Sequence, residues 1–493
     1  MLLLGIDIGT SFIKLSVVNP ETAECIASAS YPETEREIIS KRAGWAEQSP
    51  EQWWEDVKSA ILSMHGQKKY NPKDIVAIGI AYQMHGLVLV DKNKNLLRNS
   101  IIWCDSRAVS VGAKAFEITG KEKCLQQLLN SPGNFTASKL AWVKMNEPEV
   151  FEKISHILLP GDYIAMKLTR EISTTIPALS EGIFWDFRNK TISNELVSYF
   201  GIDSSLFPAI KNVFSVHGLL SREIAHKLSL KEGIPVSYKC GDQPNNALSL
   251  NVLRPGEVAA TAGTSGVIYS VTSELVYDTL SRINSFAHVN YTISHPSIGA
   301  LLCINGAGHS YAKARSEWAP GLSYSHLNEL AATVKPGADY LQVLPFGNGA
   351  ERMFENKTTS FSLVNFNKTR HGAAHIFRAV QEGVAFAFRY GLDIMTENKM
   401  KPSVVRAGKS NMFLSKVFTA CFVEASGIPL QLYKTDGSTG AALGAGIGAG
   451  IFKDELEAFG NLKTVETVTP SGNNQYWELY ENWKKTLLNQ LNK

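Results

Sequence analysis

The sequence predicts an α/β protein built from two domains. Apolar strand-like runs alternate with helical patterns along the chain, for example at Asp74–Gln83 and Ile101–Asp105, and such alternation is typical of layered α/β folds. The length of 493 residues is too great for one hydrophobic core, which favours two domains or more. A strand–turn–strand unit that occurs twice in the chain supports the same division.

Composition limits the classes of function. The chain is 44% hydrophobic and 19% charged with a net charge of +3, so no strong electrostatic field points to nucleic acid or an acidic membrane. "MLLLGI" is too short for a signal peptide, and no apolar run is long enough to span a bilayer. Six scattered cysteines indicate free thiols in a reducing compartment. We therefore expect a cytoplasmic globular protein.

The opening hairpin carries an unusual acid. "GIDIGTSFIKLSVV" (Gly5–Val18) is an apolar strand, a "GT" corner and a second strand, and Asp7 stands in the middle of the first apolar run. A strand that places a carboxylate there needs a use for it.

Two helices are indicated by their caps or their apolar spacing. Ser49, Pro50 and Gln52 form a helix start of the capping-box type. Apolar residues then fall on one helical face at Trp53, Val57, Ile61 and Met64. A long second helix is predicted over His375–Met395, where Gly383 and Ala387 allow close packing.

The opening hairpin is repeated. "AATAGTSGVIYSVT" (Ala259–Thr272) has the same layout, with Gly263–Ser265 at the place of Gly9–Ser11, about half a chain later. Two copies of one unit indicate two domains of the same kind. We expect an N-terminal domain over residues 1–248 and a C-terminal domain over residues 249–493.

Both corners suit phosphate. A tight turn of glycine and hydroxyl residues presents N–H and O–H donors to one point, as phosphate oxygens require. Two such hairpins facing each other across a cleft would hold a polyphosphate, and Asp7 would hold Mg²⁺ through water. The alternative is that both corners are only turns and that Asp7 caps backbone groups.

Two other nucleotide motifs are excluded. The sequence has no GxxxxGK[ST] string and so no Walker-type site. "GAGIGAG" (Gly444–Gly450) lies inside a small-residue helical pattern, which indicates close helix packing and not a dinucleotide fold.

A candidate base and a candidate sugar site follow strand-like runs. Asp242 comes directly after an apolar approach and could accept the proton of an attacked alcohol, although a helix N-cap is the commoner role. In the first half, "QMHG" and "WCDSR" place His85, Trp103, Asp105 and Arg107 near strand ends, where α/β proteins bind ligands. Polar groups beside an aromatic ring suit a polyol, whereas His85 alone would more often be structural.

With these motifs the chain resembles the FGGY carbohydrate kinases, and among them the xylulokinases most. The resemblance covers nearly the whole chain and rests on several motifs in order. They are "GWAEQSPEQWW" (Gly44–Trp54), "QMHG" (Gln83–Gly86), "WCDSR" (Trp103–Arg107), "GDQ" (Gly241–Gln243), "GTSG" (Gly263–Gly266) and "LPFGNGAER" (Leu344–Arg352). The resemblance implies two actin-like, ribonuclease-H-like ATPase domains flanking a central cleft for ATP and a sugar.

The resemblance also implies roles for residues. Asp242 would be the catalytic base, and Asp7 the acid that organises Mg²⁺ and ATP. The implied sugar-binding residues are Met84, His85, Trp103, Asp105, Arg107 and Gln243. The implied nucleotide-binding residues are Thr10, Ser11, Lys14, Gly263, Thr264, Gly306 and Gly408.

The chain departs from the family pattern at three places. Cys104 replaces the usual Asn, which removes an amide from the sugar neighbourhood. The glycine-rich adenine-side loop reads "RAGKSNMFLS" (Arg406–Ser415), with Gly408 as its remnant, and "GAERMF" lacks the usual Thr-Pro. The first departure concerns the identity of the sugar, and the second concerns the contacts to ATP.

The expected function is therefore an ATP- and Mg²⁺-dependent kinase that converts D-xylulose to D-xylulose 5-phosphate. One alternative is a kinase for another ketose, polyol or sugar acid, such as ribulose, rhamnulose or gluconate. Another is an actin-like ATPase or sugar sensor without kinase activity. The sequence leaves open whether the chain forms a homodimer.

Overall fold

The computed structural model describes residues 1–492 and divides the chain into two compact units. The first unit comprises Met1–Asn251, Phe286–Ile298 and Thr435–Leu462, and the second comprises Val252–Ser285, Gly299–Lys434 and the chain from Lys463 onward. The first change of unit, after Asn251, lies close to the boundary expected near residue 250. Two later segments return to the first unit, which a single boundary does not anticipate.

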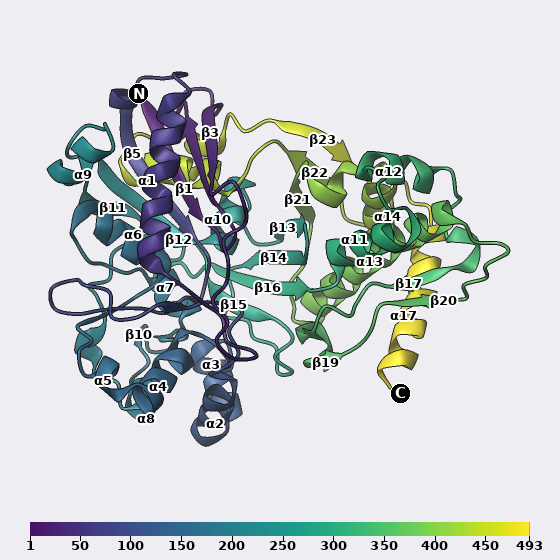
Figure 1. The fold of residues 1–493 in the computed structure, drawn as a ribbon. Helices are drawn as coiled ribbons and strands as arrows, with labels where there is room; N and C mark the ends of the chain where they lie inside the picture. Colours follow the sequence, from purple (N-terminus) through teal and green to yellow (C-terminus); the bar gives the residue numbers. More distant parts are fainter. Residues whose placement is uncertain (493) are drawn as a thin grey trace. The chain divides into compact units, whose positions relative to one another are not determined.

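A six-stranded sheet forms the centre of the first unit (Figure 1). Its spatial order is β11 (Phe214–Leu219), β12 (Pro235–Gly241), β5 (Ile75–Tyr82), β1 (Leu2–Ile8), β2 (Ile13–Val18) and β3 (Cys25–Tyr31). β1 pairs antiparallel with β2 and parallel with β5, and β5 pairs parallel with β12. The opening stretch is thus the predicted hairpin, with Asp7 directly opposite Lys14.

The second unit repeats this order. Its seven-stranded sheet runs β15 (Asn284–Ala287), β16 (Ile298–Ile304), β14 (Gly266–Thr272), β13 (Glu257–Ala262), β21 (Val404–Gly408), β22 (Leu430–Tyr433) and β23 (Thr464–Val468). β13 pairs antiparallel with β14 and parallel with β21, and β21 pairs parallel with β22. The order β3-β2-β1-β5-β12 therefore corresponds to β16-β14-β13-β21-β22, and the predicted fold of two like α/β domains is confirmed.

Helix α1 (Pro50–Gly66) covers one face of the first sheet (Figure 1). The Ser49 hydroxyl accepts the N–H of Gln52 at 3.3 Å, and Pro50 occupies the first turn, as the sequence predicts. The expected apolar face is fully buried and belongs to the same hydrophobic core as Leu4, Ile6 and Ile8, which are alternate residues of β1. Because side chains alternate along a strand, Gly5 and Asp7 point to the other face.

That other face is covered by α15 (Gly437–Gly448), a helix of small residues. A Cβ atom on Gly5 would lie 1.8 Å from the carbonyl oxygen of Ser438, and one on Gly448 would lie 1.8 Å from that of Ser237. The Gly-rich string thus lets a helix approach the sheet backbone closely, as predicted. The second long predicted helix is α13 (Ala373–Glu397), where a Cβ on Gly383 would lie 2.3 Å from the Val343 oxygen.

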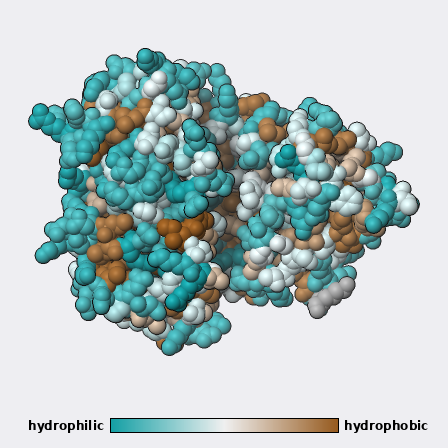
Figure 2. Space-filling view, in the orientation of Figure 1, coloured by the Kyte–Doolittle hydropathy of each residue, from teal (hydrophilic) through white to brown (hydrophobic). Residues whose placement is uncertain are grey.

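The outer surface is mixed in character. On the face that Figure 2 shows, hydrophobic residues form separate small patches among hydrophilic ones. Among residues 1–492, no helix combines the length and the apolar character needed to cross a membrane.

Candidate active site

The first corner, Gly9–Phe12, joins β1 to β2 and has its carbonyl groups held from one side. Arg36 Nη1 donates to the oxygens of Gly9 and Thr10 at 3.3 and 3.2 Å, and Gln48 Nε2 donates to the Thr10 oxygen at 2.8 Å. In a planar trans peptide the C=O and the following N–H point in opposite directions. The N–H groups of Thr10 and Ser11 therefore point away from Arg36, toward a common side where an anion could accept them.

The second corner, Gly263–Ser265, is held in the same sense by a helix. At the start of α11 (Ala307–Trp318), the N–H of Gly308 donates to the Gly263 oxygen at 3.0 Å, and the N–H of His309 donates to the Thr264 oxygen at 2.9 Å. The N–H groups of Thr264 and Ser265 consequently point away from α11. A Cβ on Gly308 would lie 2.2 Å from the Gly263 oxygen, so glycine is required for this contact.

Asp7 lies against the N-terminus of α15. A Cβ on Gly437 would come within 2.5 Å of Asp7 Oδ2, and Asn245 Nδ2 donates to the Gly437 oxygen at 2.8 Å. Burial raises the pKa of Asp7 to about 6, and the nearby carboxylate of Asp436 adds to the shift, while Lys14 opposes it. Asp7 thus lies at a partly exposed position of an otherwise apolar strand, close to the carboxylate of Asp436.

Asp242 is the first residue of α10 (Asp242–Ser249), directly after β12. The N-cap position is Gly241, so Asp242 does not play the N-cap role that sequence reasoning favoured. Its side chain is partly exposed. Burial raises its pKa to about 7, with a further contribution from Asp7, while hydrogen bonds from Gln243 lower the pKa. A carboxylate with a pKa near neutrality is suited to general base catalysis.

A buried carboxyl that no motif indicates lies beside Asp242. Glu181 ends α7 (Ile176–Glu181), and a Cβ on Gly241 would lie 2.5 Å from its Oε2. Burial, followed by the Asp242 charge, raises the pKa of Glu181 well above its usual range, and the Tyr82 hydroxyl and the His85 backbone N–H donate to the carboxyl. A carboxyl whose pKa is raised by burial therefore lies next to the candidate base.

The "QMHG" segment follows β5 and is tightly held. Met84 is buried, and a Cβ on Gly241 would lie 2.6 Å from its Cγ. His85 has a positive φ of 63°, which is strained for a residue other than glycine. Lys139 Nζ donates to the carbonyl oxygens of His85 and Ile102, each at 2.9 Å, and so ties this segment to the next.

The "WCDSR" segment (Trp103–Arg107) is a loop, so the strand expected at Ile101–Asp105 is wrong beyond Ile101. Strand β7 ends at Ile101 because the Asp105 carboxylate accepts the N–H groups of Ala46 and Arg107 and turns the chain. Trp103 is 53% exposed, and Cys104 is exposed beside it.

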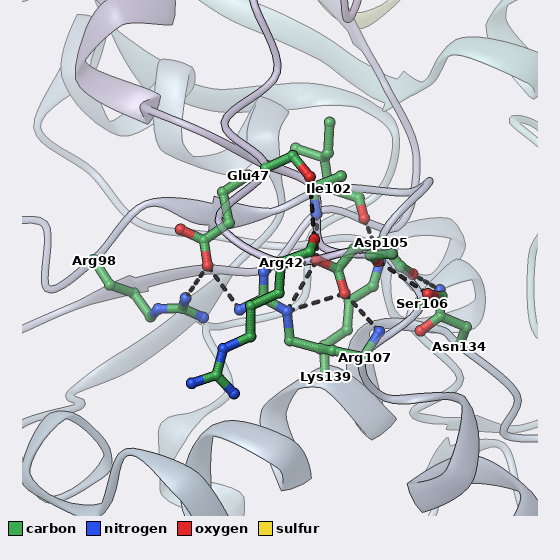
Figure 3. Close-up of polar contacts among 12 residues, drawn as sticks. Arg42, Glu47, Arg98, Ile102, Asp105, Ser106, Arg107, Asn134 and Lys139 are labelled. Carbon is green, nitrogen blue, oxygen red and sulfur yellow. Dashed lines mark hydrogen bonds and ion pairs between the residues drawn. The ribbon is translucent and has the colours of Figure 1, made fainter.

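Asp105 and Arg107 form a buried ion pair (Figure 3). Arg107 Nη2 lies 2.7 Å from Asp105 Oδ2, and Arg107 Nη1 lies 2.7 Å from Glu47 Oε1. Its guanidinium also lies 3.8 Å from the centre of the Trp45 ring. The structure thus uses both side chains to hold the loop, and direct contact of either with a sugar stays a prediction.

The remaining predicted residues lie in both units. Lys14 is exposed on β2 and Gln243 is partly exposed on α10, both in the first unit. In the second unit, Gly408 ends β21, and a Cβ on Gly306 would lie 1.5 Å from the Pro345 oxygen. Packing alone therefore requires glycine at position 306, and its N–H donates to the buried Glu351 carboxylate.

Comparison with known proteins gives one consistent family. The model described as "FGGY family of carbohydrate kinases, N-terminal domain" matches residues 2–249. The chain is 29% identical to the xylulose kinase of Bacillus subtilis (strain 168) over 90% of this chain and 86% of that protein. It is 28% identical to the xylulose kinase of Escherichia coli (strain K12) over 90% and 88%.

Solved structures agree with this. The crystal structure of xylulose kinase from Rhodospirillum rubrum has a TM-score of 0.87 at 26% identity over 100% of both chains. Gluconate kinase from Lactobacillus acidophilus shares the fold, with a TM-score of 0.87 at 21% identity over 99% of this chain and 98% of that chain. Two like sheets with matching corners, an acid on β1 and an acid after β12 thus occur in a chain that belongs to the FGGY family of carbohydrate kinases and acts as a phosphotransferase on an alcohol group of a sugar.

Proposed function

We propose that this protein transfers the γ-phosphoryl group of ATP to the terminal hydroxyl of a ketopentose, converting D-xylulose to D-xylulose 5-phosphate. The observation that carries the proposal is Asp242, a partly exposed carboxylate at the end of β12 whose pKa is raised to about 7 beside Asp7. The xylulose kinases that resemble the chain over most of its length support the choice of sugar.

Asp242 acts as the general base. The terminal hydroxyl of the sugar gives its proton to the Asp242 carboxylate while its oxygen forms a bond to the γ-phosphorus of ATP. The bond between that phosphorus and the β–γ bridging oxygen breaks, and ADP leaves. Because an acid with a pKa near 7 accepts a proton without holding it tightly, Asp242 can release the proton for the next turnover.

Backbone donors of the corners stabilise the transferring group. The N–H groups of Thr10 and Ser11, aimed away from Arg36, are proposed to donate to ATP phosphate oxygens, with Lys14 close by. In the second unit, the N–H groups of Thr264 and Ser265 and the backbone at Gly263, Gly306 and Gly408 are proposed to bind ATP. Donors that are fixed before the reaction lower the barrier most effectively, because they need no rearrangement.

The acids at the first corner fit Mg²⁺. Asp7 raises the pKa of Asp242, and Asp436 raises the pKa of Asp7, so the carboxylates lie close enough to repel one another. Mg²⁺ prefers such oxygen ligands, and one or two carboxylates suffice when phosphates and water complete its shell. Asp7 would hold the ion through water, and the bound ion supplies positive charge that offsets the phosphates.

The sugar is proposed to lie against the two loops after β5 and β7. Met84, His85 and Trp103 would contact it, and Gln243 would hold it beside Asp242. Asp105 and Arg107, as a buried pair, keep the Trp103 loop in place.

A second candidate is a kinase of the same family for another ketose, polyol or sugar acid. The specific observation is Cys104, which is exposed next to Trp103 and supplies a thiol where the family pattern has an amide. A thiol is a weak hydrogen-bond partner, so it suits a sugar with one fewer hydroxyl contact at this place.

ADP release over a panel of ketoses, polyols and sugar acids tests the proposal. We expect the highest kcat/KM with D-xylulose and a product that carries the phosphate on its terminal carbon. A higher kcat/KM with ribulose, rhamnulose or gluconate would favour the second candidate. ATP turnover that no sugar changes would contradict both and favour an ATPase or a sugar sensor.

A further inference from the structure

Thr10 of the first corner forms a closed ring of hydrogen bonds with Gln48 and Gln83. The Thr10 hydroxyl donates to Gln83 Oε1 at 3.1 Å, Gln83 Nε2 donates to Gln48 Oε1 at 3.0 Å, and Gln48 Nε2 donates to the Thr10 carbonyl oxygen at 2.8 Å. Both glutamines are almost fully buried. The ring joins the phosphate-side corner to the segment after β5.

Two tryptophans donate hydrogen bonds to different members of the ring. The buried Trp53 of α1 donates its Nε1–H to Gln48 Oε1 at 3.0 Å. Trp103 donates its Nε1–H to the Thr10 hydroxyl oxygen at 2.9 Å. An indole nitrogen is a donor only, so it fixes what its partner must be.

The direction of every bond in the ring follows from these donors. Because Trp53 can only donate and the Thr10 carbonyl can only accept, Gln48 must turn its oxygen to Trp53 and its nitrogen to Thr10. Gln83 must then present its nitrogen to the Gln48 oxygen, which leaves its own oxygen facing the Thr10 hydroxyl. The single hydroxyl proton of Thr10 is therefore committed to Gln83.

Because its proton is donated to Gln83, the Thr10 hydroxyl differs in role from the Thr10 backbone N–H. The phosphate oxygens of ATP accept hydrogen bonds at neutral pH, and the Thr10 hydroxyl has no second proton to give. The Thr10 N–H, by contrast, points away from Arg36 and is placed to donate to an anion. The hydroxyl instead accepts from Trp103, whose ring is 53% exposed.

We propose that the Thr10 hydroxyl serves the sugar side of the site and not the phosphate side, by fixing the orientation of the Trp103 indole through a ring in which Gln48 and Gln83 are positioning residues. The proposal rests on the function proposed above, in which Trp103 contacts the sugar. It adds to that function by assigning the Thr10 side chain to the sugar, through Trp103, and the Thr10 backbone N–H to the phosphate.

The first test separates the Michaelis constants of the two substrates. Thr10→Val keeps the shape of the side chain but removes the hydroxyl, and one lost hydrogen bond of about 1 kcal/mol corresponds to roughly 5-fold. We expect KM for the sugar to rise by about that factor while KM for ATP stays within about twofold. Thr10→Ser keeps the hydroxyl and should behave like the unaltered protein. A rise in KM for ATP with an unchanged KM for the sugar would overturn the proposal.

The second test is a double-mutant cycle with Trp103→Phe. If the hydroxyl acts through the indole N–H, the effect of Trp103→Phe on the sugar KM should shrink in the Thr10→Val background. The matched control is Trp477→Phe, whose side chain is 51% exposed. Additive effects of Thr10→Val and Trp103→Phe would contradict the link.

Urea unfolding of the same variants keeps the outcomes distinguishable. The Thr10–Trp103 hydrogen bond should give a coupling in the free energy of unfolding whether or not a sugar is phosphorylated. A coupling together with no phosphorylation of any sugar would refute the proposed function and leave the ring intact. No coupling together with normal sugar phosphorylation would refute the ring alone.

Discussion

The two corners of the molecule are built alike at the backbone and differ in their chemistry. Each joins the first two strands of a sheet with the same strand order, and each begins Gly-Thr-Ser. In each, the carbonyl groups of the glycine and the threonine are held from behind. Side chains of Arg36 and Gln48 do this at the first corner, and helix backbone of α11 does it at the second.

The difference lies in the acids. Two residues before its glycine, the first corner has Asp7 and the second has Thr261. The third parallel strand of the first sheet, β12, runs directly into Asp242, whereas β22 is followed by Asp436, which caps α15. Asp7, Asp242 and Asp436 all belong to the first unit, whereas outward-pointing backbone N–H groups occur at both corners. Repetition of a fold fixes donor geometry and leaves side-chain chemistry free to specialise.

The largest expected effect comes from removing the acid after β12. Asp242→Asn keeps the size of the side chain but removes the proton acceptor, so kcat should fall by roughly three orders of magnitude. Steady-state kinetics with the preferred sugar measure the change. Asp74→Asn, at an exposed aspartate directly before β5, is the matched control and should retain full activity. A loss of less than tenfold in Asp242→Asn would remove Asp242 from its role.

A smaller loss is expected at the acid that only the first corner has. Asp7→Asn should lower kcat by on the order of 10²-fold and raise the Mg²⁺ concentration needed for half-maximal rate. Thr261→Val at the corresponding place in the second sheet should leave that concentration unchanged. Equal Mg²⁺ dependence in both variants would show that the two corners do not differ in the way described.

The second corner should respond through ATP alone. Gly308→Ala forces a Cβ toward the Gly263 oxygen, to 2.2 Å without adjustment, and so displaces the N–H donors of this corner. We expect KM for ATP to rise by about tenfold with little change in KM for the sugar. Gly372→Ala is the control, because a Cβ there meets nothing within 4 Å. A selective rise in the sugar KM would contradict this assignment.

Much of the fold could be predicted because its signals are local. The cap at Ser49, the face that begins at Trp53, the repeated hairpins and the small residues of α15 all follow from short-range pattern and backbone geometry. Asp7 could be singled out because a carboxylate is unusual inside an apolar strand, whereas the proposed role of Asp242 came from the resemblance to the FGGY kinases, since its position alone favoured a helix N-cap. Their mutual effect on pKa required the structure, since they are far apart in the sequence.

What could not be predicted depends on long-range contact. The strand expected at Ile101–Asp105 is mostly a loop because Asp105 reaches back to Ala46. Glu181 gives no motif, and its burial beside Asp242 depends on α7 packing against β12. The return of Thr435–Leu462 to the first unit does not follow from the repeated hairpins. Helix α15 follows β22, a strand of the second sheet, but packs on the first sheet.

The pH dependence of kcat/KM tests the central claim, that Asp242 is the base and Asp7 tunes it, most directly. With a pKa of about 7, Asp242 is protonated at low pH and could not act as a base. We therefore expect kcat/KM to fall as the pH drops below about 7. Removing the Asp7 charge in Asp7→Asn takes away a like-charge repulsion, so the remaining activity should show this fall at a lower pH. A fall that keeps its position in Asp7→Asn, or a rate that does not change between pH 5 and pH 9, would contradict the account.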